Sequence, residues 1–422
     1  MDCIVIEGGK QLNGEVRVSG SKNAALCIMA ATVLAPGYHT IAGLPMLRDI
    51  TTMRRILEHL GALVNGTDQM CIQTETLTGV EAPYDLVRTM RASFLVLGPL
   101  LARFGRARVS LPGGCAIGVR PVDIHLKALA ALGADIAIEQ GYVVATCKKL
   151  RGTTILLDAP TVGGTENIMM AACLADGTTV IQNAAREPEI VELANALRMM
   201  GAEIQGDGTH TIVIHGVREL RPMNYTVMPD RVEAGTLMIA AGITAGDVII
   251  TNCPVHTLTA TIEKLSEAGC SVEVGDSRVR VTRRGALHPV EITTAPYPGF
   301  PTDMQAQIMA LLTLAEGTSL IRETIFENRF IHVAELDRMG ARIKVERDLA
   351  IVMGVPYLTG ARVMATDLRA SASLILAGLA AQGTTVVSRV YHLDRGYDGL
   401  EKKLQHLGAS IWRQKEPAQG LH

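Results

Sequence analysis

ILEHLGA, residues 56–62, is the first of six similar stretches that decide the fold of this chain. The other five are ALAALGA (128–134), LRMMGA (197–202), LSEAGC (265–270), LDRMGA (336–341) and LQHLGA (404–409). Their glycines follow one another at intervals of 68 to 72 residues. A second series with similar spacing comprises Gly37, Gly105, Gly177, Gly246, Gly317 and Gly383. Two matched series predict six copies of a unit of about 70 residues.

Each unit contains two kinds of helix and β-branched strand segments. The first helix is apolar on most sides, as in TDMQAQIMALLTLAEG (302–317), and such a helix is buried. Glycine is expected to end it, because the residue after a helix often needs a positive φ. A strand such as TTVIQNA (178–184) follows. The second helix, as in TTMRRILEHLGA (51–62), is charged on one side and therefore exposed.

The two ends of the chain indicate how six units divide into domains. Residues 1–20 look like a pair of strands with no helix before them, and the last unit ends at GASIWRQ (408–414) without a partner strand. The simplest closure brings the N-terminal strands to the C-terminal half. We therefore expect one domain at 21–229 and another at 1–20 plus 230–422. A cleft between domains is a favoured ligand site.

Composition excludes several classes of protein. The 422 residues are 48% apolar, 19% charged and 3% aromatic, with a net charge of −2, which is typical of a globular protein and not of a nucleic-acid binder. The eight cysteines are scattered without a CxxC pair, which favours reduced thiols over disulfides or zinc. The N-terminus is no signal peptide, and the longest uncharged run (370–388) is a poor membrane span. We expect a cytoplasmic protein without nucleic-acid or membrane partners; the oligomeric state stays open.

Basic residues recur at the predicted helix starts. The positions fourteen residues before the second glycine series are Asn23, Arg91, Gly163, Val232, Asp303 and Arg369. Thirteen residues before glycines of the first series lie Arg48, Arg120 and Arg395, and Arg329 lies eleven residues before such a glycine. Lys22 adjoins Asn23. Surface arginines are common, but seven basic residues at equivalent ends, beside helix N-termini, predict anionic ligands that carry phosphate or carboxylate. The chain has neither a GxxxxGK[ST] nor a strand–GxGxxG–helix motif.

Two residues near this charge carry candidate chemistry. Asp303 among arginines stays ionised and can accept a proton, although a capping role at the helix start explains it equally well. Cys115 lies in SLPGGCAIGVRPVDIH (110–125), among glycines and close to Arg120, and nearby cations make a thiolate available. Its role is nucleophile or proton donor. The other seven cysteines are expected to be buried and inert, and His125 to lie on a helix surface.

Several motifs together resemble one family. They are SGSKNAAL (19–26), TMRASFLVLGPLLARFG (89–105), the Cys115 loop, NAAREPEI (183–190), GFPTDMQAQ (299–307), FENRFIH (326–332), MATDLRASASL (364–374) and HLDRGYDGLEKKL (392–404). They resemble the bacterial UDP-N-acetylglucosamine 1-carboxyvinyltransferases over nearly the whole chain. The resemblance implies an α/β fold of two inside-out, barrel-like domains, each with three repeated units. It also implies transfer of the enolpyruvyl group of phosphoenolpyruvate to the 3′-hydroxyl of UDP-N-acetylglucosamine, the first committed step of peptidoglycan synthesis, without a cofactor or metal.

The resemblance also implies site residues. Cys115 is expected to protonate phosphoenolpyruvate at carbon and to react with fosfomycin, and Asp303 to take the hydroxyl proton, with Lys22 and Arg395 completing the catalytic set. The expected phosphoenolpyruvate ligands are Lys22, Asn23, Arg91, Arg120, Arg329, Arg369 and Arg395. The expected UDP-sugar ligands are Asn23, Arg91, Arg120, Pro121, Val122, Asp123, Ile124, Thr161, Val162, Gly163, Asp303 and Ile325.

Two alternatives remain at this level. The sister transferase that uses shikimate 3-phosphate shares the fold and phosphoenolpyruvate, but it lacks a cysteine in this loop, so PGGCAIG (112–118) argues against it. A non-catalytic UDP-sugar sensor on the same fold would have no need to keep Cys115, Asp303 and the arginines together.

Overall fold

The computed structural model describes residues 2–112 and 122–416. These residues separate into two compact units. Of the described residues, unit N comprises 20–112 and 122–228, and unit C comprises 2–19 and 229–416. Each unit has its own hydrophobic core. In the described residues, six four-stranded sheets are present, three in each unit.

The six sheets share one topology. In unit N their strand orders are β14-β3-β5-β4, β6-β7-β9-β8 and β10-β11-β13-β12; in unit C they are β2-β15-β17-β16, β18-β19-β21-β20 and β22-β23-β1-β24. Each sheet joins a parallel pair of strands at one edge to an antiparallel pair at the other, as in β10–β11 and β13–β12. This repetition is the structural counterpart of the sequence repeat.

The strands of unit N are β3 (Tyr38–Ala42), β4 (Leu63–Gly66), β5 (Met70–Gln73), β6 (Glu81–Ala82), β7 (Arg106–Ser110), β8 (Asp135–Glu139), β9 (Tyr142–Thr146), β10 (Thr154–Leu156), β11 (Thr178–Gln182), β12 (Glu203–Gln205), β13 (Thr211–His215) and β14 (Asn224–Thr226). Those of unit C are β1 (Asp2–Glu7), β2 (Asn13–Arg17), β15 (Asp247–Thr251), β16 (Ser271–Val274), β17 (Arg278–Thr282), β18 (Glu291–Thr293), β19 (Thr318–Arg322), β20 (Arg342–Glu346), β21 (Leu349–Met353), β22 (Arg362–Met364), β23 (Thr384–Ser388) and β24 (Ser410–Lys415).

The inner helices are α1 (Lys22–Ala31), η2 (Arg91–Val96) with α4 (Leu97–Phe104), α6 (Val162–Ala172), α8 (Arg231–Ile243), η4 (Thr302–Met304) with α10 (Gln305–Leu312), and α12 (Leu368–Ala380). The outer helices are α2 (Arg48–His59), α5 (Asp123–Ala131), α7 (Pro188–Met199), α9 (Thr259–Glu267), α11 (Val333–Arg338) and α13 (Leu400–His406). Short helices are η1 (Thr32–Leu34), α3 (Tyr84–Val87), η3 (Val255–Thr257) and η5 (Val390–Arg395).

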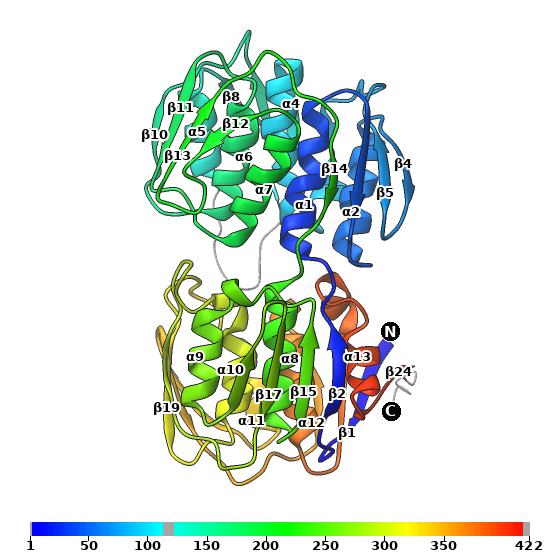
Figure 1. The fold of residues 1–422 in the computed structure, drawn as a ribbon, viewed down its shortest axis with the longest axis vertical. Coiled ribbons are helices and arrows are strands. Elements are labelled where there is room, and N and C mark those ends of the chain that lie inside the picture. The colour runs from blue at the N-terminus through cyan, green and yellow to red at the C-terminus, as the bar shows by residue number, and fades with distance from the viewer. Residues whose placement is uncertain (1, 113–121, 417–422) are drawn as a thin grey trace. The chain divides into compact units, whose positions relative to one another are not determined.

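Helices occupy the inside of each unit and sheets the outside (Figure 1). All eight residues of α10 are buried, and so is every residue of α8 except Arg231. A helix that is apolar all round has no solvent face, so it packs against other helices. The contacts of α8 with α10 and α12, and of α10 with α12, form the middle of unit C. The fold is therefore an inside-out α/β arrangement in each unit.

The N-terminal strands complete two sheets of unit C. Strand β1 lies between β23 and β24, with Ile4 opposite both Val387 and Arg413, and β2 runs parallel to β15. Figure 1 shows β1 and β2 in blue beside α13 and β24 in red. Strand β14 closes unit N in the same way, because it pairs with β3 from the first repeat.

Glycine ends all six outer helices as expected. The second residue after each of these helices is a glycine with φ between 88° and 104°. The other glycine series is less regular. In the fourth repeat Ala245, with φ 52°, takes the left-handed conformation in place of Gly246. Gly246 is needed for space instead, because a Cβ there would lie 2.2 Å from the carbonyl oxygen of Leu12.

No helix in the described ranges has both the length and the apolar character that crossing a bilayer demands.

Candidate active site

The positions predicted at the starts of the inner helices are indeed there. Arg91 is the first residue of η2, and the other five are the second residue of α1, α6, α8, η4 or α12. The unpaired backbone N–H groups of a helix start favour anions. Arg48 is exposed at the first position of α2. Arg395 and Arg329 differ, because Arg395 ends η5 and Arg329 lies in a turn before α11.

Asp303 lies between two arginines of unit C. Nη2 of Arg329 donates to Oδ1 of Asp303 at 2.9 Å, and Nη2 of Arg369 donates to Oδ2 at 2.8 Å. The arginine side chains are 4% and 3% exposed, whereas that of Asp303 is 30% exposed. Two buried guanidinium groups therefore hold the Asp303 carboxylate in place, while part of the carboxylate remains exposed to solvent.

This geometry argues against the capping interpretation of Asp303, and its catalytic role stays a prediction. The residue that precedes η4 is Pro301, and the carboxylate oxygens of Asp303 accept from guanidinium groups. Two charge-assisted hydrogen bonds hold the carboxylate in its ionised form, which is the form that accepts a proton. Capping occurs at Asp367 instead, whose side chain accepts from the backbone N–H groups of Arg369 and Ala370.

The side chain of Arg369 has hydrogen-bond donors that its ion pair with Asp303 does not use. Burial is the largest single influence and lowers its pKa, but the charge of Asp303, the hydrogen bond to Asp303 and the charges of Tyr397 and Asp230 together raise the pKa above the ordinary arginine value. The guanidinium is therefore a permanent cation. Its Nε and Nη1 atoms are buried and have no hydrogen-bond acceptor among the described residues. Buried donors without partners cost free energy, and an anion that reached them would recover it.

Glu323 is a site residue that the sequence reasoning missed. It is 4% exposed and accepts hydrogen bonds from Thr294 and Thr302, each at 2.9 Å, and from the backbone N–H of Ile325 at 2.8 Å. Thr302 precedes Asp303 in η4. One buried carboxylate thus fixes both the Asp303 turn and the predicted sugar ligand Ile325. Only its position at the end of β19 could have indicated this.

In unit N, Lys22 begins α1, whose N-cap is Ser21. Its Nζ lies 3.8 Å from Oδ2 of Asp49 in α2, and the two side chains are 12% and 5% exposed. Asn23 follows it on the same helix start. The pair is a long, nearly buried ion pair, so the ammonium is held in place while part of its surface faces solvent.

The remaining described sugar-ligand candidates lie at two neighbouring helix starts. Asp123 and Ile124 begin α5 with Val122 before them, and Thr161 is the N-cap of α6, with Val162 and Gly163 following it. Asn167 links these elements: its amide lies 3.1 Å from Nδ1 of His125 and donates to the carbonyl oxygen of Phe94 at 3.0 Å.

The prediction for His125 was wrong. It is 8% exposed and packs edge-on against Phe94, with ring centroids 5.4 Å apart. The charged neighbours on α5 suggested a surface position, but the ring fills the space above Gly163, where a Cβ would lie 3.4 Å from it. His125 therefore supports the helix starts and is not a surface residue.

Cys115, Arg120 and Pro121 lie outside the described residues. The seven described cysteines are all free; five are buried as predicted, but the prediction was wrong for Cys71 and Cys147, which are half-buried. Burial raises the pKa of Cys173 and Cys253 to about 12 and that of Cys270 to about 11. Burial and, next, Glu166 raise the pKa of Cys27 well above its ordinary value. These thiols stay protonated at neutral pH and are poor nucleophiles.

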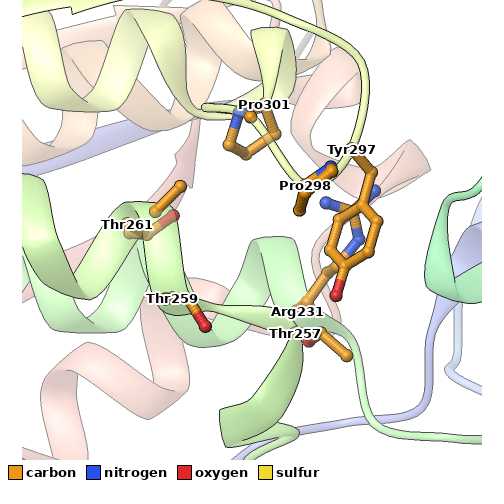
Figure 2. A pocket seen from close by; sticks show the side chains of 9 residues that line it. Arg231, Thr257, Thr259, Thr261, Tyr297, Pro298 and Pro301 are labelled. Atoms are coloured by element: carbon orange, nitrogen blue, oxygen red, sulfur yellow. The ribbon is translucent and has the colours of Figure 1, made fainter.

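A small pocket of about 20 Å³ lies beside the Asp303 turn (Figure 2). Arg231, Thr257, Thr261, Tyr297 and Pro301 are among its lining residues. The volume suits one water molecule and is too small for a sugar or phosphoenolpyruvate. The described residues contain no cluster of three or more His, Cys, Asp or Glu side chains suited to a metal ion.

Comparisons with known proteins cover nearly the whole chain. The sequence profile of the family "EPSP synthase (3-phosphoshikimate 1-carboxyvinyltransferase)" matches residues 6–404. Among curated relatives, the UDP-N-acetylglucosamine 1-carboxyvinyltransferase of Geobacter metallireducens is 60% identical over 417 residues, covering 99% of this chain and 100% of the relative. The protein of the same name from Myxococcus xanthus is 56% identical over 419 residues, covering 98% and 100%.

Solved structures show the same fold. The enolpyruvyl transferase NikO from Streptomyces tendae superposes with a TM-score of 0.89 at 30% identity, covering 99% of both chains. EPSP synthase from Acinetobacter baumannii superposes with a TM-score of 0.78 at 19% identity, covering 98% of this chain and 100% of that one, which shows the fold alone. By its full-length relatives and its family profile, this chain belongs to the EPSP synthase family of carboxyvinyltransferases and, within it, to the UDP-N-acetylglucosamine 1-carboxyvinyltransferases.

Proposed function

We propose that the protein transfers the enolpyruvyl group of phosphoenolpyruvate to the 3′-hydroxyl of UDP-N-acetylglucosamine and releases phosphate, which commits the sugar to peptidoglycan synthesis. In the addition step a proton goes to the methylene carbon, and the sugar oxygen bonds to the adjacent carbon. In the elimination step the new methyl group loses a proton as the carbon–oxygen bond to phosphate breaks. One sugar nucleotide and one phosphoenolpyruvate give one enolpyruvyl ether and one phosphate.

The observation that carries this proposal is the Asp303 carboxylate between two buried arginines. Addition of a hydroxyl to an enol ether needs a base at oxygen and an acid at carbon. Asp303 is ionised and partly exposed, so it is suited to accept the hydroxyl proton. Cys115 is the acid in this scheme, and Lys22 and Arg395 are the cations that stabilise developing negative charge.

The binding roles follow from charge. Phosphoenolpyruvate carries a phosphate and a carboxylate, which arginine holds with paired hydrogen bonds. The Nε and Nη1 donors of Arg369, which have no acceptor in the part of the chain that the structure describes, support a role in anion binding. We assign Lys22, Asn23, Arg91, Arg120, Arg329, Arg369 and Arg395 to phosphoenolpyruvate. We assign Asn23, Arg91, Arg120–Ile124, Thr161–Gly163, Asp303 and Ile325 to the sugar nucleotide.

We further propose that the chain works as two domains, 21–229 and 1–20 plus 230–422, without nucleic-acid or membrane partners. The pairing of β1 and β2 with strands of the C-terminal half supports these borders. The free, mostly buried cysteines suit a reducing compartment, which supports a cytoplasmic location.

Phosphate release from phosphoenolpyruvate tests the proposal. We expect release with UDP-N-acetylglucosamine, none with shikimate 3-phosphate and none without an acceptor. Release with shikimate 3-phosphate alone supports the sister transferase. Binding of UDP-N-acetylglucosamine without phosphate release supports a sugar sensor and contradicts the proposal. Activity that chelation abolishes and a divalent ion restores contradicts metal-free chemistry.

A further inference from the structure

A buried polar network lies directly behind Asp303 in unit C. It contains Thr236 of α8, Gln307 of α10 and Tyr397, which follows η5. Thr236 and Gln307 have no exposed surface, and Tyr397 is 3% exposed. Polar groups are costly to bury in a helical core and are retained where hydrogen bonds fix a geometry. The burial of this network therefore indicates that its hydrogen bonds fix a geometry that matters for function.

The direction of its hydrogen bonds follows from their partners. The Thr236 hydroxyl donates to the carbonyl oxygen of Val232 at 2.8 Å, so it accepts from the Tyr397 hydroxyl, 3.0 Å away. The Tyr397 oxygen in turn accepts from Nε2 of Gln307 at 3.1 Å. The same Nε2 donates to the backbone carbonyl oxygen of Asp303 at 2.8 Å. A chain of hydrogen bonds thus runs from Asp303 through Gln307 to the Tyr397 hydroxyl.

The ring of Tyr397 contacts the other half of the ion pair. Cζ of Arg369 lies 5.4 Å from the centre of this ring. Both side chains are about 3% exposed, so the cation–π attraction acts in a desolvated setting, where it is strongest. Burial, the largest influence, raises the pKa of the phenol, which keeps its hydroxyl protonated as the hydrogen-bond chain requires.

We propose that Tyr397 is a positioning residue that holds both members of the Asp303–Arg369 pair: Arg369 through its ring, and Asp303 through its hydroxyl and Gln307. It touches neither substrate in this account. The inference rests on the proposed function, because the effect is read in the transfer reaction. In physical terms, the Asp303 carboxylate and the Arg369 guanidinium keep their relative position only while Tyr397 holds both residues in place.

Two substitutions separate the ring from the hydroxyl. Tyr397→Phe keeps the ring and loses the two hydrogen bonds of the hydroxyl, to Thr236 and from Gln307, so we expect kcat to fall about threefold. Tyr397→Leu removes the ring as well, and we expect kcat to fall at least about tenfold more. KM for UDP-N-acetylglucosamine should stay within about twofold in both, because Asp303 is only one of the ligands assigned to the sugar nucleotide and the others do not depend on Tyr397 in this account. A smaller loss of kcat in Tyr397→Phe than in Tyr397→Leu is the result expected if the ring of Tyr397 holds Arg369 in place.

A double-mutant cycle tests the path through Gln307. Gln307→Met removes the amide at similar length and should cost about as much as Tyr397→Phe. If the hydroxyl acts through Gln307, Tyr397→Phe has no further effect on kcat in the Gln307→Met background. Two independent, multiplying losses contradict this path.

Leu404→Ala is the matched stability control. Leu404 is fully buried in the same core, on α13, and its apolar side chain can form no hydrogen bond within the network that Tyr397 forms. We expect its melting temperature to fall at least as far as that of Tyr397→Leu while kcat stays at the wild-type value. Wild-type kcat in Tyr397→Leu, or equal kcat losses in both variants, overturns the inference. Inactive wild-type protein contradicts the proposed function instead, so the two failures are distinguishable.

Discussion

Asp303 and Arg369 form a 2.8 Å hydrogen-bonded ion pair in which the cation is buried and the carboxylate is partly exposed. The asymmetry matters because a buried guanidinium cannot easily leave its partner, whereas the carboxylate keeps a face toward solvent and ligands. The pair therefore gives the proposed base a fixed position. Arg329 doubles the effect from the other carboxylate oxygen.

Asp303→Asn removes this base with little change in size. We expect kcat to fall by a factor on the order of 10² to 10⁴, the usual contribution of a positioned base. Asp247→Asn is the control, because Asp247 forms a 2.7 Å ion pair with Arg280 that is about 40% exposed, and neither residue adjoins an assigned site residue in sequence. Steady-state kinetics of both variants test the assignment. Equal, wild-type kcat values contradict it.

Cys115 is predicted to act as an acid as well as a reactive thiol. Cys115→Ser should lose most activity, because a serine hydroxyl is a far weaker acid. Cys115→Asp should keep substantial activity and resist fosfomycin, because a carboxyl group delivers a proton but is a poor nucleophile toward the epoxide. Mass spectrometry should locate the fosfomycin adduct on Cys115 and leave buried Cys173 and Cys253 unmodified.

The opposite pattern counts against the catalytic role. A purely structural thiol tolerates serine better than aspartate, because serine is closer in size and uncharged. Normal turnover of Cys115→Ser together with an inactive Cys115→Asp therefore refutes the role assigned here.

The positive φ of the glycines that end the outer helices leads to a prediction about stability. Gly133 has φ 96°, and a Cβ there would meet nothing within 4 Å, so alanine costs only backbone strain. We expect Gly133→Ala to lower the free energy of unfolding by about 1 to 2 kcal/mol. Gly285 has equal space but no positive φ, so Gly285→Ala is the matched control and should be neutral or slightly stabilising. Thermal melts that rank the two variants the other way contradict the strain argument.

The environment of His39 leads us to predict that the fold loses stability as the pH falls. It is fully buried; Nδ1 accepts from the backbone N–H of Met223, and Nε2 lies 3.1 Å from the carbonyl oxygen of Ala35. This arrangement fits only a neutral ring, and burial lowers the pKa to about 4. An unfolded histidine titrates near 6.5, so between pH 6.5 and 4 the unfolded chain binds the extra proton. Stability should therefore fall by about 3 kcal/mol as pH falls through this window.

Melting temperatures from pH 7 to 4.5 test this effect. His39→Gln should be less stable at pH 7 but lose less stability on acidification than the wild type. His256→Gln changes an exposed histidine and serves as the control. An unchanged pH slope in His39→Gln shows that other groups cause the acid sensitivity.

The repeat and the helix starts could be predicted because they rest on local signals. Glycine at the end of each outer helix reflects a positive φ, and apolar sequence reflects burial, so Gly61 and α10 are readable from the chain. Asp303 was also identified, but its two roles could not be separated. The choice depended on Arg329 and Arg369, which are 26 and 66 residues away in sequence.

Supporting residues were missed for the same reason. Glu323, Gln307 and Tyr397 act through hydrogen bonds and ring contacts whose partners come from other repeats or distant turns. Their residue types are unremarkable at the ends of strands and helices. His125 was placed on the wrong side because α5 is only weakly amphipathic, and the deciding contact, Asn167, lies on another helix.

The central claim is that this chain joins an enolpyruvyl group to the 3′-oxygen of UDP-N-acetylglucosamine. The most direct test is to incubate the purified protein with phosphoenolpyruvate and UDP-N-acetylglucosamine, without added metal, and to identify the products by NMR and mass spectrometry. The account predicts a sugar nucleotide with an enolpyruvyl ether on the 3′-oxygen, formed in equal amount to free phosphate. Unchanged UDP-N-acetylglucosamine, or phosphate released without this ether, contradicts it.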